Sequence, residues 1–161
     1  MSTETSVTSV EQTVSVALAP REAFDLFVHR MESWWPEDHH MLDMTDDELD
    51  RMVVEPEAGG RIYDVAKSGN ECCWAHVLAY EPPVRFAFSW DITPTWQIEQ
   101  DRARCSEVNV SFEPDGDGTL VRLVHRHLDR HGEGWEGMRD AVGSPGGWGR
   151  GLSAFVAAAA G

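Results

Sequence analysis

The densest group of potential metal ligands lies in the stretch M-E-S-W-W-P-E-D-H-H-M-L-D, residues 31–43. His39 and His40 stand there between Asp38 and Asp43, and imidazole and carboxylate groups are ligands that zinc takes in proteins. Adjacent histidines in a loop rarely turn toward one ion, and the H-E-x-x-H spacing of a helical zinc site is absent. We therefore predict no metal site and no cofactor.

His125 is the histidine whose position favours chemistry most. It alternates with Val121 and Leu123 along an expected strand, so its side chain should point where theirs point, into a core or a cavity. One interpretation is a buried histidine satisfied by a neighbouring hydroxyl or carbonyl group. The other is a ligand contact that could exchange a proton near neutral pH. Arg122 and Arg126 occupy the opposite face, where we expect them to pair with acids.

A glycine-rich motif, G-E-G-W-E-G at residues 132–137, formally matches the G-x-G-x-x-G of dinucleotide sites. Such a site lies between a parallel strand and a helix. Here the preceding strand belongs to an antiparallel hairpin, and two glutamates within the motif would repel a pyrophosphate. We therefore predict a loop with a packing tryptophan at this place.

The thiols and hydroxyls suggest no reaction from their order alone. Cys72, Cys73 and Cys105 are odd in number and lack C-x-x-C spacing, which argues against a disulfide framework and a zinc site. We expect reduced thiols. No Ser-His-Asp or Cys-His arrangement can be argued from chain order, so the enzymatic question stays open.

Large aromatic side chains gather in the segments that should face the interior. Trp34 and Trp35 end one amphipathic pattern, and Phe86, Phe88 and Trp90 share one face of an expected strand. Core packing explains most of them. Several wide rings on a concave sheet face exceed what one helix can cover, however, which favours a pocket. Trp74 and Tyr80 should share one strand face with His76, and the pattern is compatible with that face pointing either inward or outward.

Hydrophobic periodicity places these residues on strands and helices. Residues 13–18 alternate as a first strand, and an apolar stripe then runs from Pro20 to Trp35 with helical spacing, ended by Pro36. A second helix should begin with Ser144 as N-cap and Pro145 at its first position. Between the two helices, apolar residues recur with a period of two, which is typical of strands. The expected strands there are residues 51–55, 61–65, 71–80, 84–90, 105–112 and 119–127.

This order predicts an α+β fold, in which a curved antiparallel sheet of about six to seven strands packs against helices on one side. We expect a flexible tail at residues 1–11 and a single domain at residues 12–161. A strongly twisted sheet curled around a helix leaves an apolar gap, which is the natural binding site of this architecture.

Composition limits the classes of partner. The chain has 161 residues, 42% of them hydrophobic, and a formal net charge of −15. Such a charge repels phosphate backbones and anionic lipids, so we predict no nucleic-acid or membrane partner. The N-terminus lacks a signal-peptide pattern, and no apolar run approaches the ~20 residues of a membrane span. We expect a cytoplasmic protein, monomeric or homodimeric.

Several segments together resemble one superfamily. They are S-W-W-P (33–36), A-G-G-R (58–61), V-L-A-Y-E-P-P-V-R-F-A-F-S-W (77–90), S-E-V-N-V-S-F (106–112), V-R-L-V-H-R (121–126) and H-G-E-G-W-E (131–136). In this order they resemble the START-like (SRPBCC) superfamily, in the bacterial branch related to the C-terminal domain of the activator of Hsp90 ATPase. The resemblance implies a helix-grip fold, with a long C-terminal helix held over a cavity, and places His39 at the cavity rim.

Three functions are compatible with that resemblance. The first is binding of a small hydrophobic or aromatic molecule in the cavity. The second is a chaperone-associated interaction domain, and the third is a cyclase- or hydrolase-type enzyme that uses His125 in the same cavity. Eight residues are the candidates for lining it: Trp34, Trp35, His39, Phe86, Phe88, Trp90, His125 and Trp148.

Overall fold

A curved antiparallel sheet dominates the computed structural model, which describes residues 8–36 and 48–161. The predictions for His39 and His40 therefore lie outside the described residues. The sheet has the order β1-β7-β6-β5-β4-β3-β2, and every neighbouring pair is antiparallel. Its strands are β1 (Val10–Val16), β2 (Leu49–Val54), β3 (Arg61–Ala66), β4 (Glu71–Glu81), β5 (Arg85–Trp90), β6 (Ser106–Asp115) and β7 (Gly118–Arg126). The predicted α+β helix-grip architecture is confirmed.

The first helical segment is less regular than its apolar stripe predicts. It consists of α1 (Pro20–Phe24), a π-helical turn η1 (Asp25–His29) and a 3₁₀ turn η2 (Met31–Ser33). The stripe is nevertheless buried as predicted, including Phe24, Phe27, Trp34 and Trp35. The wider π turn and the tighter 3₁₀ turn adjust the spacing, so that rings at uneven intervals can reach the same core.

The C-terminal region contains two helices where one was predicted. After the 3₁₀ turns η5 (Arg102–Arg104) and η6 (Leu128–His131), the chain forms α2 (Trp135–Val142) and then α3 (Trp148–Ala159). The predicted loop at residues 132–137 is therefore wrong in its second half, because α2 begins there. The predicted cap is also wrong: Gly147 caps α3, while the Ser144 hydroxyl donates to the Ala141 carbonyl at the end of α2.

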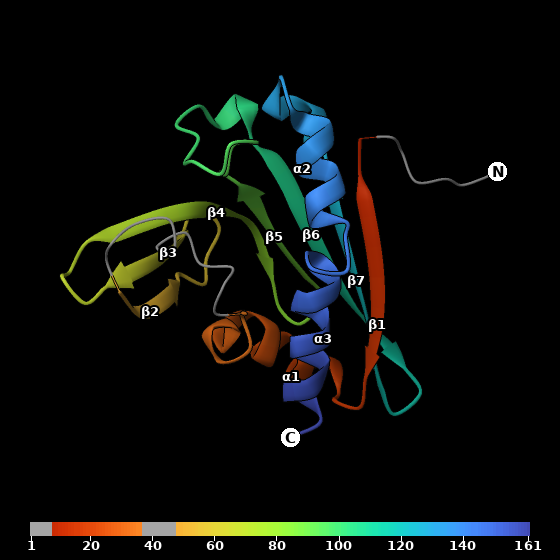
Figure 1. Ribbon diagram of the computed structural model, residues 1–161. Helices are drawn as coiled ribbons and strands as arrows, with labels where there is room; N and C mark the ends of the chain where they lie inside the picture. The colour runs from red at the N-terminus through yellow and green to blue at the C-terminus, as the bar shows by residue number, and fades with distance from the viewer. Residues whose placement is uncertain (1–7, 37–47) are drawn as a thin grey trace.

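The core lies between the concave face of the sheet and the helices. Figure 1 shows α2 and α3 running in front of β6 and β7, with α1 at the lower end. Phe155 of α3 contacts Phe27 and Trp34, with ring centroids 5.2 and 5.4 Å apart. On the other face of β7, Arg122 pairs with Glu11 at 2.6 Å and Arg126 with Glu107 at 3.3 Å. This confirms their predicted outward direction.

Candidate ligand-binding site

Four tryptophans from four parts of the chain form a closed ring of contacts in the interior, which we call the tryptophan cluster. Trp35 stacks on Trp74 at 5.1 Å between ring centroids, and Trp74 meets Trp90 edge to face at 5.9 Å. Trp90 contacts Trp148 at 5.6 Å, and Trp148 returns to Trp35 at 5.9 Å. Each ring is at most 8% exposed.

Local structure explains why these four rings meet. Trp35 is the second residue after the 3₁₀ turn η2, and Trp90 is the last residue of β5. Trp74 occupies a β-bulge of β4, because Ile62 pairs with Ala75 while the next residue, Tyr63, pairs with Cys73. Trp148 opens α3 immediately after Gly147, whose position tolerates no side chain. A Cβ there would lie 2.4 Å from the carbonyl oxygens of Ala141 and Val142.

A chain of hydrogen bonds links the tryptophan cluster to two histidines. The indole Nε1–H of Trp148 donates to Nδ1 of His125 over 3.0 Å. The other ring nitrogen of His125, Nε2, lies 2.7 Å from the hydroxyl of Ser106, which lies 2.7 Å from Nε2 of His131. We call these four side chains the histidine relay. Trp148, Ser106 and both histidines are almost completely buried.

Donor and acceptor roles along the relay follow from the indole, which can only donate. His125 accepts at Nδ1, so in its neutral form it carries its proton on Nε2 and donates to Ser106. The Ser106 hydroxyl is then free to donate to Nε2 of His131. His131 in turn keeps its proton on Nδ1. The relay therefore presents His131 as a neutral N–H donor.

Burial keeps both histidines neutral at pH 7. Burial lowers the pKa of His125 to about 3, and the nearby His131 adds to this effect. The pKa of His131 is also lowered, chiefly by burial. Since a charged imidazole would lose its hydration here, the site acts through neutral hydrogen bonds.

Within residues 8–36 and 48–161, four buried side-chain nitrogen or oxygen atoms have no hydrogen-bond partner. Three are N–H groups: Nε1 of Trp74, Nε1 of Trp90 and Nδ1 of His131. The fourth is Oδ1 of Asp91, whose charge acts on the nearby Cys105 thiol. Buried polar atoms are normally paired, so three unpaired donors in and beside one aromatic cluster indicate a place for an acceptor.

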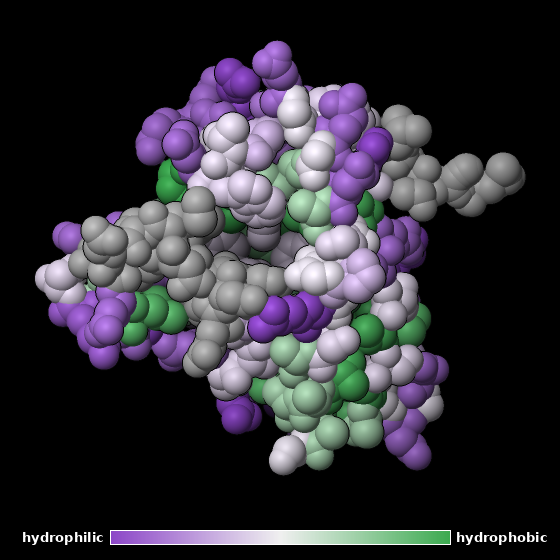
Figure 2. Space-filling view, in the orientation of Figure 1, coloured by the Kyte–Doolittle hydropathy of each residue, from purple (hydrophilic) through white to green (hydrophobic). Residues whose placement is uncertain are grey.

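The space-filling view shows that the surface is hollowed beside the C-terminal helices. In Figure 2 a recess opens beside the α2–α3 segment, at the place where Figure 1 shows β5 and β6 behind it. Trp90 ends β5, Ser106 begins β6, and Trp148 begins α3. The cluster and the relay thus lie between the sheet and the start of α3.

The structure brings together half of the predicted site residues. Trp35, Trp90, Trp148 and His125 belong to the cluster or the relay. The ring centroid of Phe88 lies 6.4 Å from that of Trp74, and Phe86 in turn contacts the ring of Phe88. Trp34 instead turns to the core, where its Nε1–H donates to the Leu26 carbonyl over 3.0 Å.

Sequence reasoning did not select Trp74, Ser106 or His131 for this site. The bulge hid Trp74, since strict alternation would place it on the face of His76. His131 lies in η6, after His127 takes a left-handed conformation with φ of 62°, and no periodic signal reaches it. The motif S-E-V-N-V at the start of β6 gave the one available hint, because Ser106 alternates with the buried Val108 and Val110.

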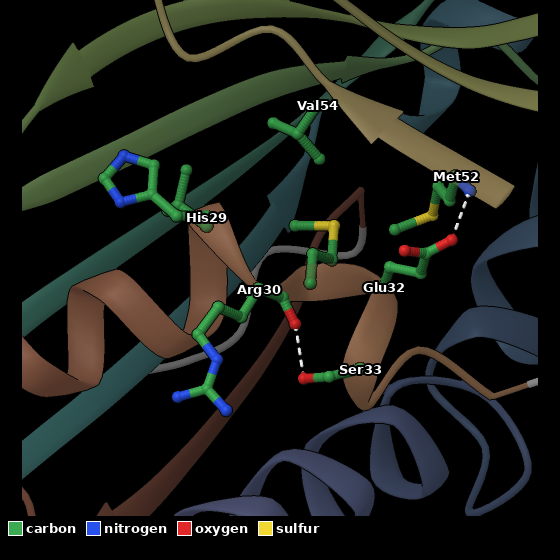
Figure 3. Close-up of a pocket in the computed structure, with 8 residues that line it drawn as sticks. His29, Arg30, Glu32, Ser33, Met52 and Val54 are labelled. Atoms are coloured by element: carbon green, nitrogen blue, oxygen red, sulfur yellow. Dashed lines mark hydrogen bonds between the residues drawn. The ribbon is translucent and has the colours of Figure 1, made fainter.

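A second recess lies between the first helical segment and β2, with a volume of about 290 Å³. Several of its polar groups already have structural partners. Figure 3 shows Glu32 accepting a hydrogen bond from the backbone N–H of Met52, and the Ser33 hydroxyl donating to the Arg30 carbonyl. His29 lies between Asp25 and Tyr80, 2.8 and 2.7 Å away. The contacts of His29 with Tyr80 and of Glu32 with Met52 hold the segment against the sheet.

The sequence matches the family described as activator of Hsp90 ATPase homolog 1-like protein over residues 18–160. The chain belongs to this family. No curated protein matches it. No helix in the described residues is long and apolar enough to cross a membrane.

Solved structures share the fold over nearly the whole chain. "An anthrahydroquino-Gama-pyrone synthase Txn09 complexed with SUM" is 34% identical, with 95% of this chain and 99% of that chain covered and a TM-score of 0.63. Protein NE0264 from Nitrosomonas europaea is 12% identical, with 99% and 98% covered and a TM-score of 0.68. A protein from Arthrobacter aurescens is 14% identical, with 99% and 91% covered and a TM-score of 0.64. The two less similar structures show the helix-grip fold alone.

Proposed function

We propose that this protein binds a planar aromatic molecule bearing carbonyl oxygens at the tryptophan cluster. The observation that carries the proposal is the pair of buried, unpartnered indole N–H groups of Trp74 and Trp90. An unsatisfied buried donor costs about 1–3 kcal/mol. A ligand oxygen that accepts from either indole would recover that energy, so an oxygenated ligand is preferred to a hydrocarbon.

The surroundings of these donors favour an aromatic ligand without charge. The rings of the cluster offer faces and edges for stacking and edge-to-face contact. Both relay histidines are neutral at pH 7, so they do not neutralise the negative charge of an anionic ligand. The 34% identical synthase is named for an anthrahydroquino-γ-pyrone, and such a name denotes an oxygenated aromatic compound of this chemical kind.

Quenching of tryptophan fluorescence tests the proposal with two tricyclic probes. 9-Fluorenone carries one carbonyl oxygen, and fluorene has the same ring skeleton without it. We expect saturable quenching by fluorenone and a dissociation constant for fluorene that is higher by about tenfold or more, because a site built for a polar group rejects the analogue lacking it.

Two tryptophan variants separate binding from folding. Trp90→Phe removes one N–H but keeps an aromatic ring, and should reduce the preference for fluorenone to about threefold or less. Trp34→Phe is the matched control, since the Trp34 N–H donates to Leu26 in the core. It should leave the preference unchanged. Absence of saturable quenching, or the same response in both variants, would overturn the proposal.

A second candidate function is ring closure on such a ligand, favoured by the relay that ends at Nδ1–H of His131. A neutral imidazole N–H can stabilise the negative charge that develops on a carbonyl oxygen under attack. The expected reaction is formation of a γ-pyrone ring: a phenol oxygen attacks a ketone carbon of the same molecule, and water is lost.

The probe for this reaction is o-hydroxybenzoylacetone, which loses water to give 2-methylchromone with a change in ultraviolet absorption. We expect the protein to accelerate closure above the buffer rate. His131→Ala should lower kcat by about tenfold or more, with a smaller effect on KM, while Trp34→Phe retains activity. Closure at the buffer rate excludes this candidate and leaves the binding proposal to its own test.

A further inference from the structure

A separate cavity between β3, β4 and the segment that joins β5 to β6 contains a thiol, an imidazole and a carboxylate in contact. It has a volume of about 390 Å³ and is lined by Arg61, Cys72, Cys73, His76, Asp91 and Glu99, among others. The Cys73 thiol donates to the Ala75 carbonyl over 3.4 Å, and its sulfur lies 3.9 Å from Nε2 of His76, within the range of a hydrogen bond to sulfur. Nδ1 of His76 lies 2.7 Å from Oδ2 of Asp91.

The β-bulge at Trp74 explains how Cys73 and His76 come to face each other. Residues three apart on a regular strand point to opposite faces. The extra residue shifts that alternation, so both side chains reach the same cavity while Trp74 enters the core. The Ser89 hydroxyl accepts a hydrogen bond from the His76 backbone N–H over 3.0 Å, which fixes the strand at this point.

Asp91 is built into the fold as the orienting group. Its side chain is 3% exposed, against 25% for His76. Its backbone N–H donates to the Trp74 carbonyl, and its carbonyl accepts from the Glu99 N–H over 2.8 Å. Since the carboxylate accepts from Nδ1–H of His76, the free Nε2 of a neutral imidazole points to the thiol. This is the nucleophile, base and orienter arrangement of an activated thiol.

We propose that Cys73, His76 and Asp91 form a second site, at which the Cys73 thiol adds to an activated alkene, an α,β-unsaturated carbonyl compound. This inference is independent of the function proposed for the tryptophan cluster. The three side chains line one cavity together, and the thiol and the imidazole are both partly exposed to it.

The addition requires only groups present at the site and the alkene. Burial raises the pKa of the Cys73 thiol, so the thiol rests protonated and needs a base. His76 takes the thiol proton at Nε2 while sulfur attacks the β-carbon. An S–C bond forms, and the π pair of the double bond moves onto the α-carbon and carbonyl as an enolate. The proton then returns from His76 to the α-carbon, without a leaving group or an oxidant.

Cys72 provides an internal control on the same strand. It is also partly exposed, and burial likewise raises its thiol pKa. Among the described residues, no hydrogen bond joins Cys72 to a histidine, whereas Cys73 contacts His76. A difference in alkylation between the two thiols therefore reports the contribution of His76 more directly than a comparison with a free thiol would.

The test is alkylation of the intact protein by N-ethylmaleimide, an activated alkene, with each cysteine followed by peptide mass spectrometry. At pH 7 we expect Cys73 to react about tenfold or more faster than Cys72, within the range of general-base assistance. His76→Gln should slow Cys73 to a similar extent and leave the Cys72 rate unchanged. Equal rates in the wild type, or no effect of His76→Gln in a folded variant, would contradict the proposal.

A second measurement needs no variant and covers the case in which His76→Gln does not fold. Between pH 6 and 8, alkylation of an unassisted thiol rises about tenfold per pH unit, because only the thiolate reacts. Cys72 should follow this slope. Cys73 should show a shallower rise, since His76 removes the proton during attack. The same steep slope for both thiols overturns the proposal.

Discussion

His125 is a buried base whose neutrality contributes to stability in a pH-dependent way. Its pKa falls from the ordinary 6.5 to about 3 in the folded protein, whereas the unfolded chain keeps the ordinary value. Between these values the unfolded state binds a proton that the folded state does not. The free energy of unfolding should therefore be largest above pH 6.5 and fall by about 1.4 kcal/mol per pH unit as the pH drops toward 5.

Urea denaturation at pH 7.5, 6.5, 5.5 and 5.0 measures this dependence. His125→Gln removes the titrating group but keeps an amide N–H that can donate toward Ser106. We expect its unfolding free energy to be lower than wild type at pH 7.5 and to decline less steeply below pH 6.5, with the remaining slope including His131. Parallel profiles for the two proteins would show that His125 does not carry the linkage.

The residues of the site differ in how far sequence could reveal them. His125 was predictable because it continues the alternation of Val121 and Leu123, both of which are fully buried. Cys73 and His76 were not, because their meeting depends on the bulge at Trp74, and a bulge leaves no reliable mark in one sequence. The contact of Ser106 with His131 depends on the turn η6, whose conformation no hydrophobic periodicity encodes.

The joint between α2 and α3 is the element that places Trp148 against His125. A Cβ on Gly147 would approach two backbone carbonyl oxygens at 2.4 Å, and backbone cannot yield cheaply. Gly147→Ala should therefore destabilise the fold by about 2 kcal/mol or more. Gly137→Ala is the matched control, since its Cβ would meet nothing within 4 Å in the exposed face of α2.

Chemical denaturation followed by circular dichroism separates the two variants. Gly137→Ala should be neutral or stabilise by about 1 kcal/mol, because alanine has the higher helix propensity. Fluorescence should also report Gly147→Ala, as displaced Trp148 loses its hydrogen bond to His125. Equal unfolding free energies for both alanine variants would show that the joint between α2 and α3 accommodates a Cβ without loss of stability.

At the scale of elements, sequence periodicity predicted strands better than helix ends. All seven strands were expected, because each alternates or lies between clear turns. The first helix of the C-terminal pair, α2, was missed because Gly132, Gly134 and Gly137 indicate a loop. Only packing of Met138 and Val142 into the core, both buried, overrides that local preference. The start of α3 was misplaced for a related reason: Gly147 serves a close approach that sequence cannot show.

At the scale of the whole molecule, the net charge of −15 creates a negative electrostatic field that acts on any charged ligand as it approaches. Ion pairs such as Arg122 with Glu11 neutralise the outer face only locally, and acids outnumber bases 28 to 13. An anionic aromatic ligand must approach against this field, whereas a neutral one does not experience it. Because salt screens the interaction over a Debye length of about 10 Å at 0.1 M, ligand charge should determine the salt dependence of binding.

The comparison of 9-fluorenone with 9-fluorenone-2-carboxylate makes this argument quantitative. Between about 20 and 300 mM sodium chloride, the dissociation constant of the carboxylate should fall by about threefold or more as the repulsion is screened. That of fluorenone should change by less than about twofold, which controls for effects of salt on the fold and on apolar burial. Tighter binding of the carboxylate at low salt would mean that a local positive field overcomes the global charge. The two relay histidines would not supply that field, because both are neutral at pH 7.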